Sequence, residues 1–83
     1  MSPRRIPKKL GYKLRAIREF KGWSLDQMAS ELGKMGSSRR TRVFEWENGK
    51  RQPELATLLA YAKLANVAVE SLIDDEITIV LSQ

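Results

Sequence analysis

A helix-start signal at Ser24, followed closely by Gly33, limits this part of the chain to one short helix. The Ser24 hydroxyl can accept a hydrogen bond from the backbone N–H of Gln27, and the Gln27 side chain can reach back, which together make a capping box. Gly33 is free to adopt the left-handed conformation that ends many helices. We therefore predict a helix over residues 25–32. Its inward face is expected to consist of Met28, Ala29 and Leu32.

Further start and stop signals predict two helices on either side of this one. A first helix over residues 8–21 is ended by Gly22, which can take the left-handed conformation. A third helix, capped by Ser37 or Ser38, extends to about Asn48. Three basic residues of the first helix are placed largely outside its apolar stripe: Lys13, Arg15 and Arg18.

Two more helices are predicted in the second half of the chain. Pro53 is expected at or near the first position of a fourth helix, where its missing N–H does no harm. That helix ends at Asn66, and a short fifth helix covers residues 69–73. Apolar residues at helical spacing are assigned to the core of the whole domain: Leu10, Leu14, Ile17, Val43, Trp46, Leu55, Leu58, Leu59, Ala62, Leu64, Ala65, Val69, Leu72 and Ile73.

The C-terminal residues have a different pattern. Ile77, Ile79 and Leu81 occupy alternate positions in a segment rich in β-branched residues, which favours a strand. We expect a short strand at residues 77–81 that pairs, antiparallel, with a second copy of the chain across a two-fold axis. The alternative is a tail that folds back onto its own helices or is disordered.

Positive charge is concentrated in the first two thirds of the chain. Residues 1–53 contain 14 Lys and Arg and 5 Asp and Glu, a net charge of +9. Residues 54–83 contain 1 Lys and 5 acidic residues, a net charge of −4, which brings the whole chain to +5. A surface with this charge is typical of proteins that bind polyanions such as nucleic acids. The alternative is a solvated basic face that only aids solubility.

Length and composition exclude several classes of protein. The 83 residues predict one all-α domain at residues 9–75, with a flexible basic arm at 1–8 and a strand-like tail at 76–83. Because cysteine and histidine are both absent, we expect no catalytic residues, no metal and no cofactor. The apolar runs are shorter than the ~20 residues that a membrane span needs, and no signal-peptide segment follows the N-terminus. The protein is therefore expected to be cytoplasmic.

Residues 38–47 combine the features of a DNA-recognition helix. A short helix and a turn precede them, and Val43 and Trp46, three positions apart, can face inward. The polar side chains left to face outward are Arg39, Arg40, Thr41, Arg42 and Glu45. This pattern is typical of a helix-turn-helix, in which the second helix enters the major groove of DNA.

From about residue 10 to residue 74, the sequence resembles the Cro-like, phage-repressor-like helix-turn-helix family, of the xenobiotic-response-element type. The most specific motif is Trp-Glu-Asn-Gly-Lys-Arg-Gln-Pro at residues 46–53. Other matching residues lie at 14–18, 22–24, 28–29, 32–33, 58–59 and 64–67. The resemblance implies a compact five-helix, lambda-repressor-like domain that binds specific sequences of double-stranded DNA, usually as a homodimer.

The sequence departs from the family pattern at three places. Gly33 and Trp46 lie thirteen positions apart, about four more than is usual, so extra residues around 34–37 either lengthen the turn or add a turn to the third helix. Leu25 replaces a glutamine that often contacts a phosphate, and that contact is expected to be lost. Ala68 replaces the usual Ser or Thr cap of the fifth helix, which should lower local stability by ~1 kcal/mol.

The resemblance assigns base contacts to Arg40, Thr41, Phe44 and Glu45. Arg40 could pair with O6 and N7 of guanine, and Glu45 could accept a hydrogen bond from N4 of cytosine. Thr41 and Phe44 could contact thymine methyl groups. Alternatively, Phe44 is a core or dimer residue displaced by the extra residues, and the arginines of this helix form a solvated face.

Contacts to the DNA backbone are expected from six residues: Arg39, Arg42, Lys50, Arg51 and, in the arm, Arg4 and Arg5. The loop at residues 48–51 offers backbone amides and two cations to phosphates, which would position the protein without reading sequence. Alternatively, the loop only ends the third helix. By resemblance, Glu47 is expected to form an ion pair with Arg18 that ties the third helix to the first.

These observations predict a transcriptional regulator, specifically a repressor of the bacterial or phage type that is associated with the nucleoid. The alternative is an antitoxin-type interaction module that binds a small protein partner as well as its own promoter. In that case the C-terminal strand would offer an edge to the partner.

Overall fold

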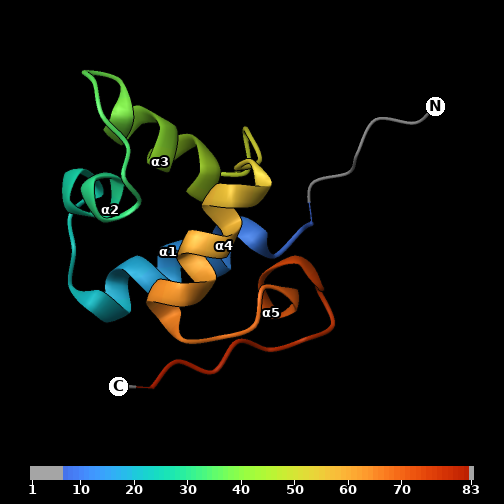
Figure 1. The fold of residues 1–83 in the computed structure, drawn as a ribbon. Helices are drawn as coiled ribbons and strands as arrows, with labels where there is room; N and C mark the ends of the chain where they lie inside the picture. The colour runs from blue at the N-terminus through green and yellow to red at the C-terminus, as the bar shows by residue number, and fades with distance from the viewer. Residues whose placement is uncertain (1–6, 83) are drawn as a thin grey trace.

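The computed structural model describes residues 7–82, in which the helices are α1 (Leu10–Lys21), α2 (Leu25–Glu31), α3 (Arg39–Glu47), α4 (Leu55–Ala65) and α5 (Glu70–Ile73) (Figure 1). No strand occurs within this part of the chain. The predicted all-α, five-helix architecture is therefore confirmed. None of the helices in residues 7–82 is both long and apolar enough to span a membrane.

Both ends of α2 lie where the sequence predicts them, after Ser24 and before Gly33. Ser24 Oγ accepts a hydrogen bond from the Gln27 N–H at 3.1 Å, as predicted. The Gln27 side chain, however, donates to Glu31 at 2.7 Å and does not complete the capping box. At the other end, Gly33 has a φ of 77° and the next N–H bonds back to the carbonyl of Ala29 at 2.9 Å. A helix ended in this way is stopped sharply, and the chain leaves it toward α3.

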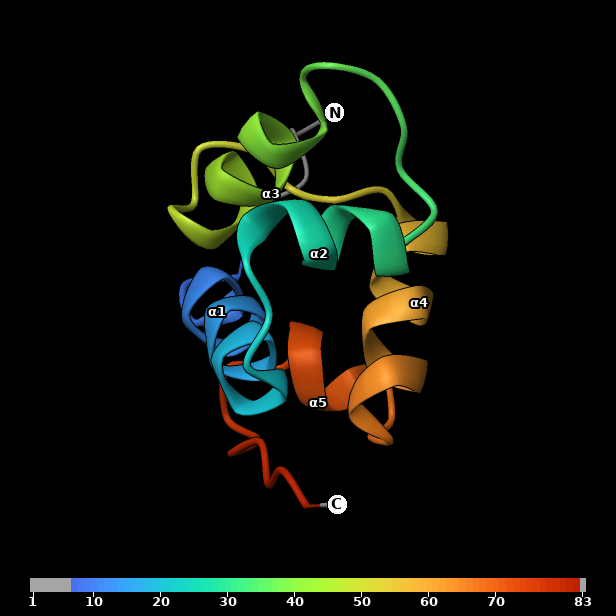
Figure 2. The same ribbon diagram turned by 90° about the vertical axis from the view of Figure 1, so that its left-hand side faces the viewer.

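The core lies where the five helices meet, and most of the predicted core residues are buried. Its members are Leu10, Leu14, Ile17, Met28, Ala29, Leu32, Val43, Trp46, Leu58, Tyr61, Ala62, Ala65 and Leu72. Viewed from two sides, α3 lies at one end of the molecule and the C-terminal segment at the other (Figures 1 and 2). The core therefore separates these two surfaces.

Several core predictions in α4 and α5 are wrong. Leu55 and Leu59 are exposed, because the buried stripe of α4 runs through Leu58 and Tyr61 on another face of the helix. Ile73 is 40% exposed, because its neighbour Leu72 fills the only inward position of the four-residue α5. Pro53 lies near the start of α4, as predicted, two positions before its first residue, and is fully buried.

The predicted strand at residues 77–81 is also wrong. This segment folds back onto the domain, where Ile79 and Leu81 pack against the core. The carbonyl of Ile77 accepts a hydrogen bond from Lys13 of α1 at 2.7 Å. Because its own helices cover these side chains and satisfy this carbonyl, the segment does not need a second strand.

Lys13 and Asp75 fasten this C-terminal segment to α1. Lys13 was placed outside the apolar stripe, yet it is only 2% exposed. Its ammonium donates to three backbone carbonyls, those of Ser71, Asp74 and Ile77, at 2.6, 2.9 and 2.7 Å. The carboxylate of Asp75 accepts hydrogen bonds from the backbone N–H groups of Lys8 and Lys9, both at 2.9 Å. The three carbonyls account for the burial of the Lys13 ammonium, which forms no ion pair within residues 7–82.

Candidate nucleic-acid interface

The inner face of α3 anchors it to the core. Val43 is fully buried and Trp46 is 8% exposed. The Trp46 ring meets the ring of Tyr61 in α4 edge to face, with centroids 6.4 Å apart and an interplanar angle of 76°. Aromatic pairs favour this geometry. The two inward residues thus fix the rotation of α3 about its own axis.

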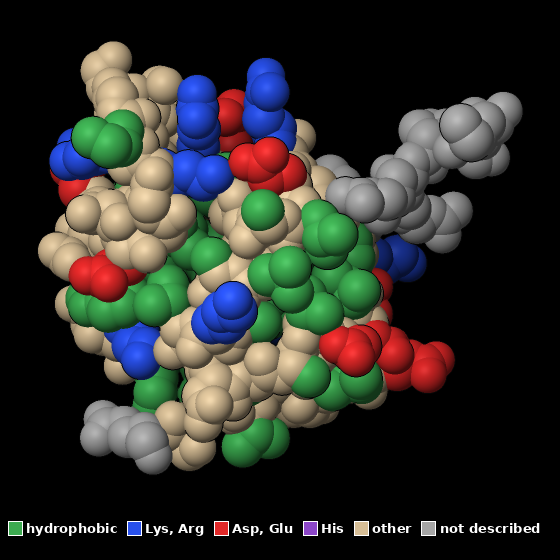
Figure 3. All heavy atoms as spheres, in the orientation of Figure 1, with side chains coloured by type: hydrophobic (Ala, Val, Ile, Leu, Met, Phe, Trp, Pro, Cys, Tyr) green, Lys and Arg blue, Asp and Glu red, His purple; other side chains and the backbone are tan. Residues whose placement is uncertain are grey.

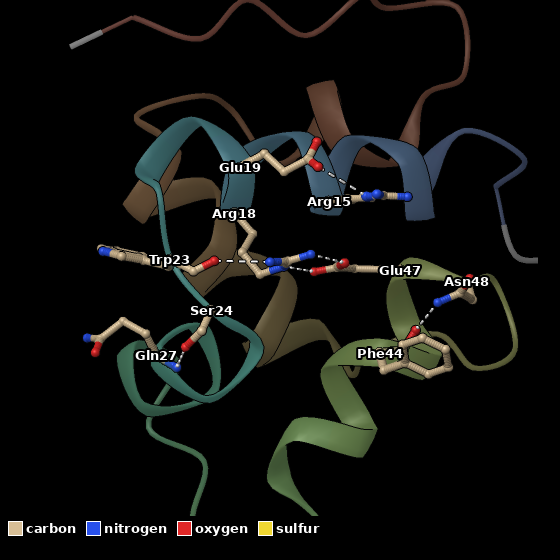
Figure 4. A network of polar contacts seen from close by, with 9 residues as sticks. All are labelled: Arg15, Arg18, Glu19, Trp23, Ser24, Gln27, Phe44, Glu47 and Asn48. Atoms are coloured by element: carbon tan, nitrogen blue, oxygen red, sulfur yellow. Dashed lines mark hydrogen bonds and ion pairs between the residues drawn. The ribbon is translucent and has the colours of Figure 1, made fainter.

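An ion pair ties the C-terminal end of α3 to α1. Arg18 Nε donates to Glu47 Oε2 at 2.7 Å and Arg18 Nη2 donates to Glu47 Oε1 at 3.1 Å. Its remaining nitrogen, Nη1, donates to the carbonyl of Trp23 at 3.0 Å (Figure 4). The Glu47 side chain is only 4% exposed. Arg18, which belongs to α1, therefore connects this helix both to α3 and to the loop that precedes α2.

The surroundings of this ion pair change the pKa of two groups. The hydrogen bond to Glu47 raises the pKa of Arg18 above its ordinary value. Burial raises the pKa of the Tyr61 hydroxyl, and the nearby Glu47 adds to the effect. Arg18 and Tyr61 therefore both keep their protons at any physiological pH.

The close contact between the backbones of α1 and α3 was not predicted from the sequence. Gly11 of α1 faces the backbone at the end of α3, where a side chain would collide with it. Ala29, the small residue predicted on the inward face of α2, is buried as well. A glycine one position after an apolar residue gives no periodic signal of its own, so the sequence offered no direct means of finding it.

The outer face of α3 carries the predicted base-contacting residues. Arg40 and Thr41 are exposed, Phe44 is 47% exposed and Glu45 is half-buried. Ser38 stands at the cap position of α3, but its side chain makes no capping hydrogen bond. Arg40 and Thr41, in the first turn of α3, are therefore open to solvent.

Weak ion pairs restrain several of these side chains. Asp26, in the first turn of α2, lies 3.5 Å from Arg39 Nε and 4.0 Å from Arg40 Nη1. Glu45 lies 3.6 Å from Arg51 Nε. Since these groups are partly exposed, such pairs contribute little to stability, and a stronger anionic ligand can replace them. Arg42 and Lys50 take part in no ion pair within residues 7–82.

A glycine turn directs two cations outward after α3. Gly49 has a φ of 73°, and the N–H of Lys50 bonds back to the carbonyl of Glu45 at 3.0 Å. Asn48 closes the same end by donating to the carbonyl of Phe44 at 2.7 Å (Figure 4). Lys50 and Arg51 then stand exposed beside the outer face of α3.

The extra residues between α2 and α3 lengthen the turn and leave α3 at nine residues. The turn forms the wide loop between the two helices in Figure 2. Lys34 anchors it through an ion pair with Glu54, at 3.1 Å, next to the start of α4. Met35, beyond this anchor, is 81% exposed. Of the two alternatives that the spacing left open, the longer turn is therefore the one observed.

Charge is divided between the two ends of the molecule. Lys and Arg side chains gather over α3 and the loop after it, whereas Asp and Glu side chains gather near α5 (Figure 3). A few acidic side chains also lie among the cations. The surface that presents α3 is thus the one suited to a polyanion. Arg4 and Arg5, the arm residues expected to add to it, lie outside the described residues.

Comparison with known proteins agrees with this geometry. A model of the helix-turn-helix family matches residues 14–72, which is most of the chain. The chain belongs to the Cro-type helix-turn-helix family. The resemblance inferred from the sequence is therefore confirmed. Members of this Cro-type family are DNA-binding transcription regulators and not enzymes.

One solved structure shares the Cro-type fold of this chain. The N-terminal DNA binding domain of SinR from Bacillus subtilis is similar to it with a TM-score of 0.68 and 22% sequence identity. The similarity covers 82% of this chain and 94% of that domain. No curated protein matches the sequence. At 22% identity, this comparison supports the fold alone. The roles of individual residues in this chain are therefore argued from its own geometry.

Proposed function

We propose that this chain is a transcriptional repressor that binds specific sites in double-stranded DNA by placing α3 in the major groove. The observation that carries the proposal is the contrast between the two faces of α3. Val43 and Trp46 hold one face in the core, while the other presents exposed polar side chains to solvent. A helix that enters the major groove needs such an arrangement. Repression requires only that the bound domain occupy a promoter.

Base contacts are assigned to the outer face of α3. Arg40 reaches guanine O6 and N7, Glu45 accepts from cytosine N4, and Thr41 and Phe44 meet thymine methyl groups. Support for Arg40 comes from its exposure and from the weakness of its contact with Asp26, at 4.0 Å. Glu45 would exchange its contact with Arg51 for the base, which leaves the arginine free for a phosphate.

Phosphate contacts are assigned to residues on both sides of α3. Arg39 and Arg42 flank the base-contacting side chains, and Lys50 and Arg51 follow the helix. Arg4 and Arg5 in the basic arm would add contacts to phosphates or to an adjacent minor groove. Such contacts position the protein on DNA and make its affinity depend on salt.

Two copies would bind together as a homodimer, in the cytoplasm and associated with the nucleoid. Half-sites in a symmetric operator lie about one DNA turn, ~34 Å, apart. The domain measures 33 Å along its two longer axes, so two copies side by side fit that spacing. Exposed apolar side chains away from α3, Tyr12 and Val80 among them, offer a surface for the contact.

Salt titration and selection of sites from random duplex DNA test this function. If the protein neutralises about five to eight phosphates, log affinity should fall with log salt at a slope of roughly −4 to −7. The selected sites should share a two-fold symmetric sequence. A slope near zero, or no enrichment of any sequence at low salt, would contradict the proposal.

An antitoxin-type module that binds a small protein partner as well as its own promoter is the second candidate. The predicted strand edge no longer supports it. A mainly apolar groove between α1 and the C-terminal segment, lined by Tyr12, Ala16, Ile77 and Leu81 with others, favours it instead. Co-expression with the neighbouring gene, followed by purification, tests it. A stable complex that still binds DNA would support this second candidate.

A further inference from the structure

Leu25 and Phe44 form an apolar patch on the DNA-facing side of the domain, which we call the Leu25/Phe44 patch. Leu25 is the first residue of α2 and is half-buried, whereas Phe44 lies in the middle of α3 and is 47% exposed. The two side chains together line two neighbouring hollows, of about 330 and 240 Å³. Leu25, a departure from the family pattern, and Phe44, a predicted base-contacting residue, therefore meet at one place although they are nineteen positions apart in the sequence.

The rim of this patch is polar and mainly cationic. Arg40 and Thr41 complete the lining of the larger hollow. Arg15 and Arg18 contribute to the smaller one, in which Glu47 is already neutralised by Arg18. Figure 4 shows Phe44 near Asn48, toward the C-terminal end of α3. Arg15 and Arg40 also have carboxylate partners, Glu19 at 3.3 Å and Asp26 at 4.0 Å, but both pairs are exposed and weak. An anionic occupant that offers a small apolar group can therefore displace these partners and suits the patch.

Thymine in duplex DNA meets both requirements. Its C5-methyl group is the apolar group that a base pair of ordinary DNA presents in the major groove, and phosphates surround it. A protein partner would instead have to place an apolar side chain among arginines without the benefit of a polyanion. The charge of the rim therefore favours DNA as the occupant.

We propose that the Leu25/Phe44 patch is a receptor for the C5-methyl group of one thymine, and that Leu25 is a specificity-determining residue. This inference rests on the proposed function, because α3 has to lie in the major groove. Arg40 and Phe44 are one helical turn apart, about 6 Å along the axis, and base pairs rise 3.4 Å each. The thymine thus lies within about two base pairs of the base that Arg40 contacts.

Replacement of thymine by deoxyuridine tests the proposal, because it removes the methyl group and leaves every hydrogen-bonding group in place. In a site selected from random duplex DNA, each thymine is replaced in turn and the Kd is measured at one salt concentration. We expect replacement at one position in each half-site to weaken binding about fourfold, equivalent to one buried methyl group at ~0.8 kcal/mol. Replacement at positions that neither this patch nor Thr41 contacts should change the Kd by less than about 1.5-fold.

Variants connect this effect to the patch. Phe44→Ala and Leu25→Ala should each bind more weakly and should lose the difference between thymine and deoxyuridine at that position. Leu59→Ala, which truncates an exposed apolar side chain of α4, serves as the matched control and should keep the full difference. Circular dichroism checks that all three variants remain folded.

The outcomes separate this inference from the function on which it rests. Specific, salt-dependent binding that is indifferent to every deoxyuridine would overturn the methyl receptor and leave the DNA-binding function intact. An effect that persists in both patch variants would place the receptor elsewhere on α3. If the chain binds no duplex but a co-purified protein shields Phe44, both proposals fail and the patch is a protein contact.

Discussion

Gly11 in α1 lies directly against the backbone carbonyl of Glu47, the last residue of α3. A Cβ atom at position 11 would come within 2.5 Å of the Glu47 oxygen and 3.0 Å of its carbon. Both groups belong to helix backbones, which cannot move aside as a flexible side chain could. The distance between α1 and α3, and with it the position of the recognition helix, therefore depends on the absence of a side chain at this residue.

Gly11→Ala is predicted to destabilise the domain and to weaken DNA binding. Alanine favours helix over glycine by up to ~1 kcal/mol, but here overpacking should outweigh that gain and lower the free energy of unfolding by about 1–3 kcal/mol. Urea denaturation followed by circular dichroism measures the change. Ser30→Ala, at an exposed position of α2, is the control and should stay within about 0.5 kcal/mol. A more stable Gly11→Ala protein would show that α1 and α3 are free to separate.

Glu47→Gln is predicted to lower stability far more than the same change at Glu19. Glu47 is buried and accepts two hydrogen bonds from Arg18. The loss of its negative charge leaves the Arg18 cation poorly paired and should lower the free energy of unfolding by about 2–4 kcal/mol. Glu19 pairs with Arg15 at 3.3 Å, but both side chains are more than half exposed. Glu19→Gln should therefore change stability by less than about 0.5 kcal/mol. Chemical denaturation of both variants gives the comparison, and equal losses would contradict it.

The sequence predicted the helices well because their ends are determined locally. Gly33 and Gly49 end their helices with a left-handed residue, and Ser24 caps α2 through a residue three positions away. Such signals depend only on neighbours in the chain. The strand at residues 77–81 failed for the opposite reason. The conformation of this segment depends on a hydrogen bond from Lys13, more than sixty residues earlier in the chain. The alternation of apolar residues within the segment carries no information on such a distant partner.

Lys13→Met is predicted to loosen the C-terminal segment. Methionine keeps much of the apolar stem but leaves three carbonyls without the ammonium that now binds them. Hydrogen bonds to charged groups are worth about 1.5–3 kcal/mol each, but removal of the ammonium also removes the cost of burying its charge. The domain should therefore lose roughly 2–4 kcal/mol in place of the full sum of the three bonds. Hydrogen exchange should also become faster over residues 74–82. Lys63→Met, on the exposed face of α4, is the matched control, and equal protection of the segment in both variants would refute this role.

Asp75 is predicted to make stability depend on pH. Its hydrogen bonds from the backbone N–H groups of Lys9 and Lys8 lower the pKa of the carboxyl below its ordinary value of 3.8. A carboxyl with a lowered pKa in the folded state stabilises the fold above its unfolded pKa and loses that contribution as the pH falls through its folded pKa. Asp75→Asn should therefore melt below the wild type at pH 6.

The difference in melting temperature between wild type and Asp75→Asn should shrink as the pH falls from about 5 to about 2. Glu76→Gln removes the neighbouring, exposed carboxylate and is the control for the change in net charge. Thermal melts of the three proteins at a series of pH values measure the effect. A difference that is constant across the series would mean that the charge of Asp75 does not matter.

The residues that contact bases and phosphates were assigned from the sequence only by its resemblance to the family. The structure shows that Arg40, Thr41 and Phe44 share an exposed face, which helical spacing alone could suggest. The link from Phe44 to Leu25 depends on how α2 crosses α3, and residues that far apart meet only in the folded chain. The ion pair of Arg18 with Glu47, which ties α3 to α1, was predicted from the resemblance. The close contact of Gly11 with the end of α3 was not predicted.

Arg40→Ala and Lys50→Ala are predicted to affect DNA binding in different ways. Arg40 is exposed near the start of α3, where a guanine contact should contribute ~1–3 kcal/mol at one base position. Its variant should therefore bind the selected site more weakly and lose preference at that position. Lys50 is exposed after the helix-ending Gly49 and is assigned to a DNA phosphate, so its variant should bind all sequences less tightly and show a salt slope shallower by about one. Binding measured on the selected site and on all single-base changes separates the two effects. If Lys50→Ala alters the preferred base while Arg40→Ala weakens every site equally, the two roles are reversed and α3 enters the groove in another orientation.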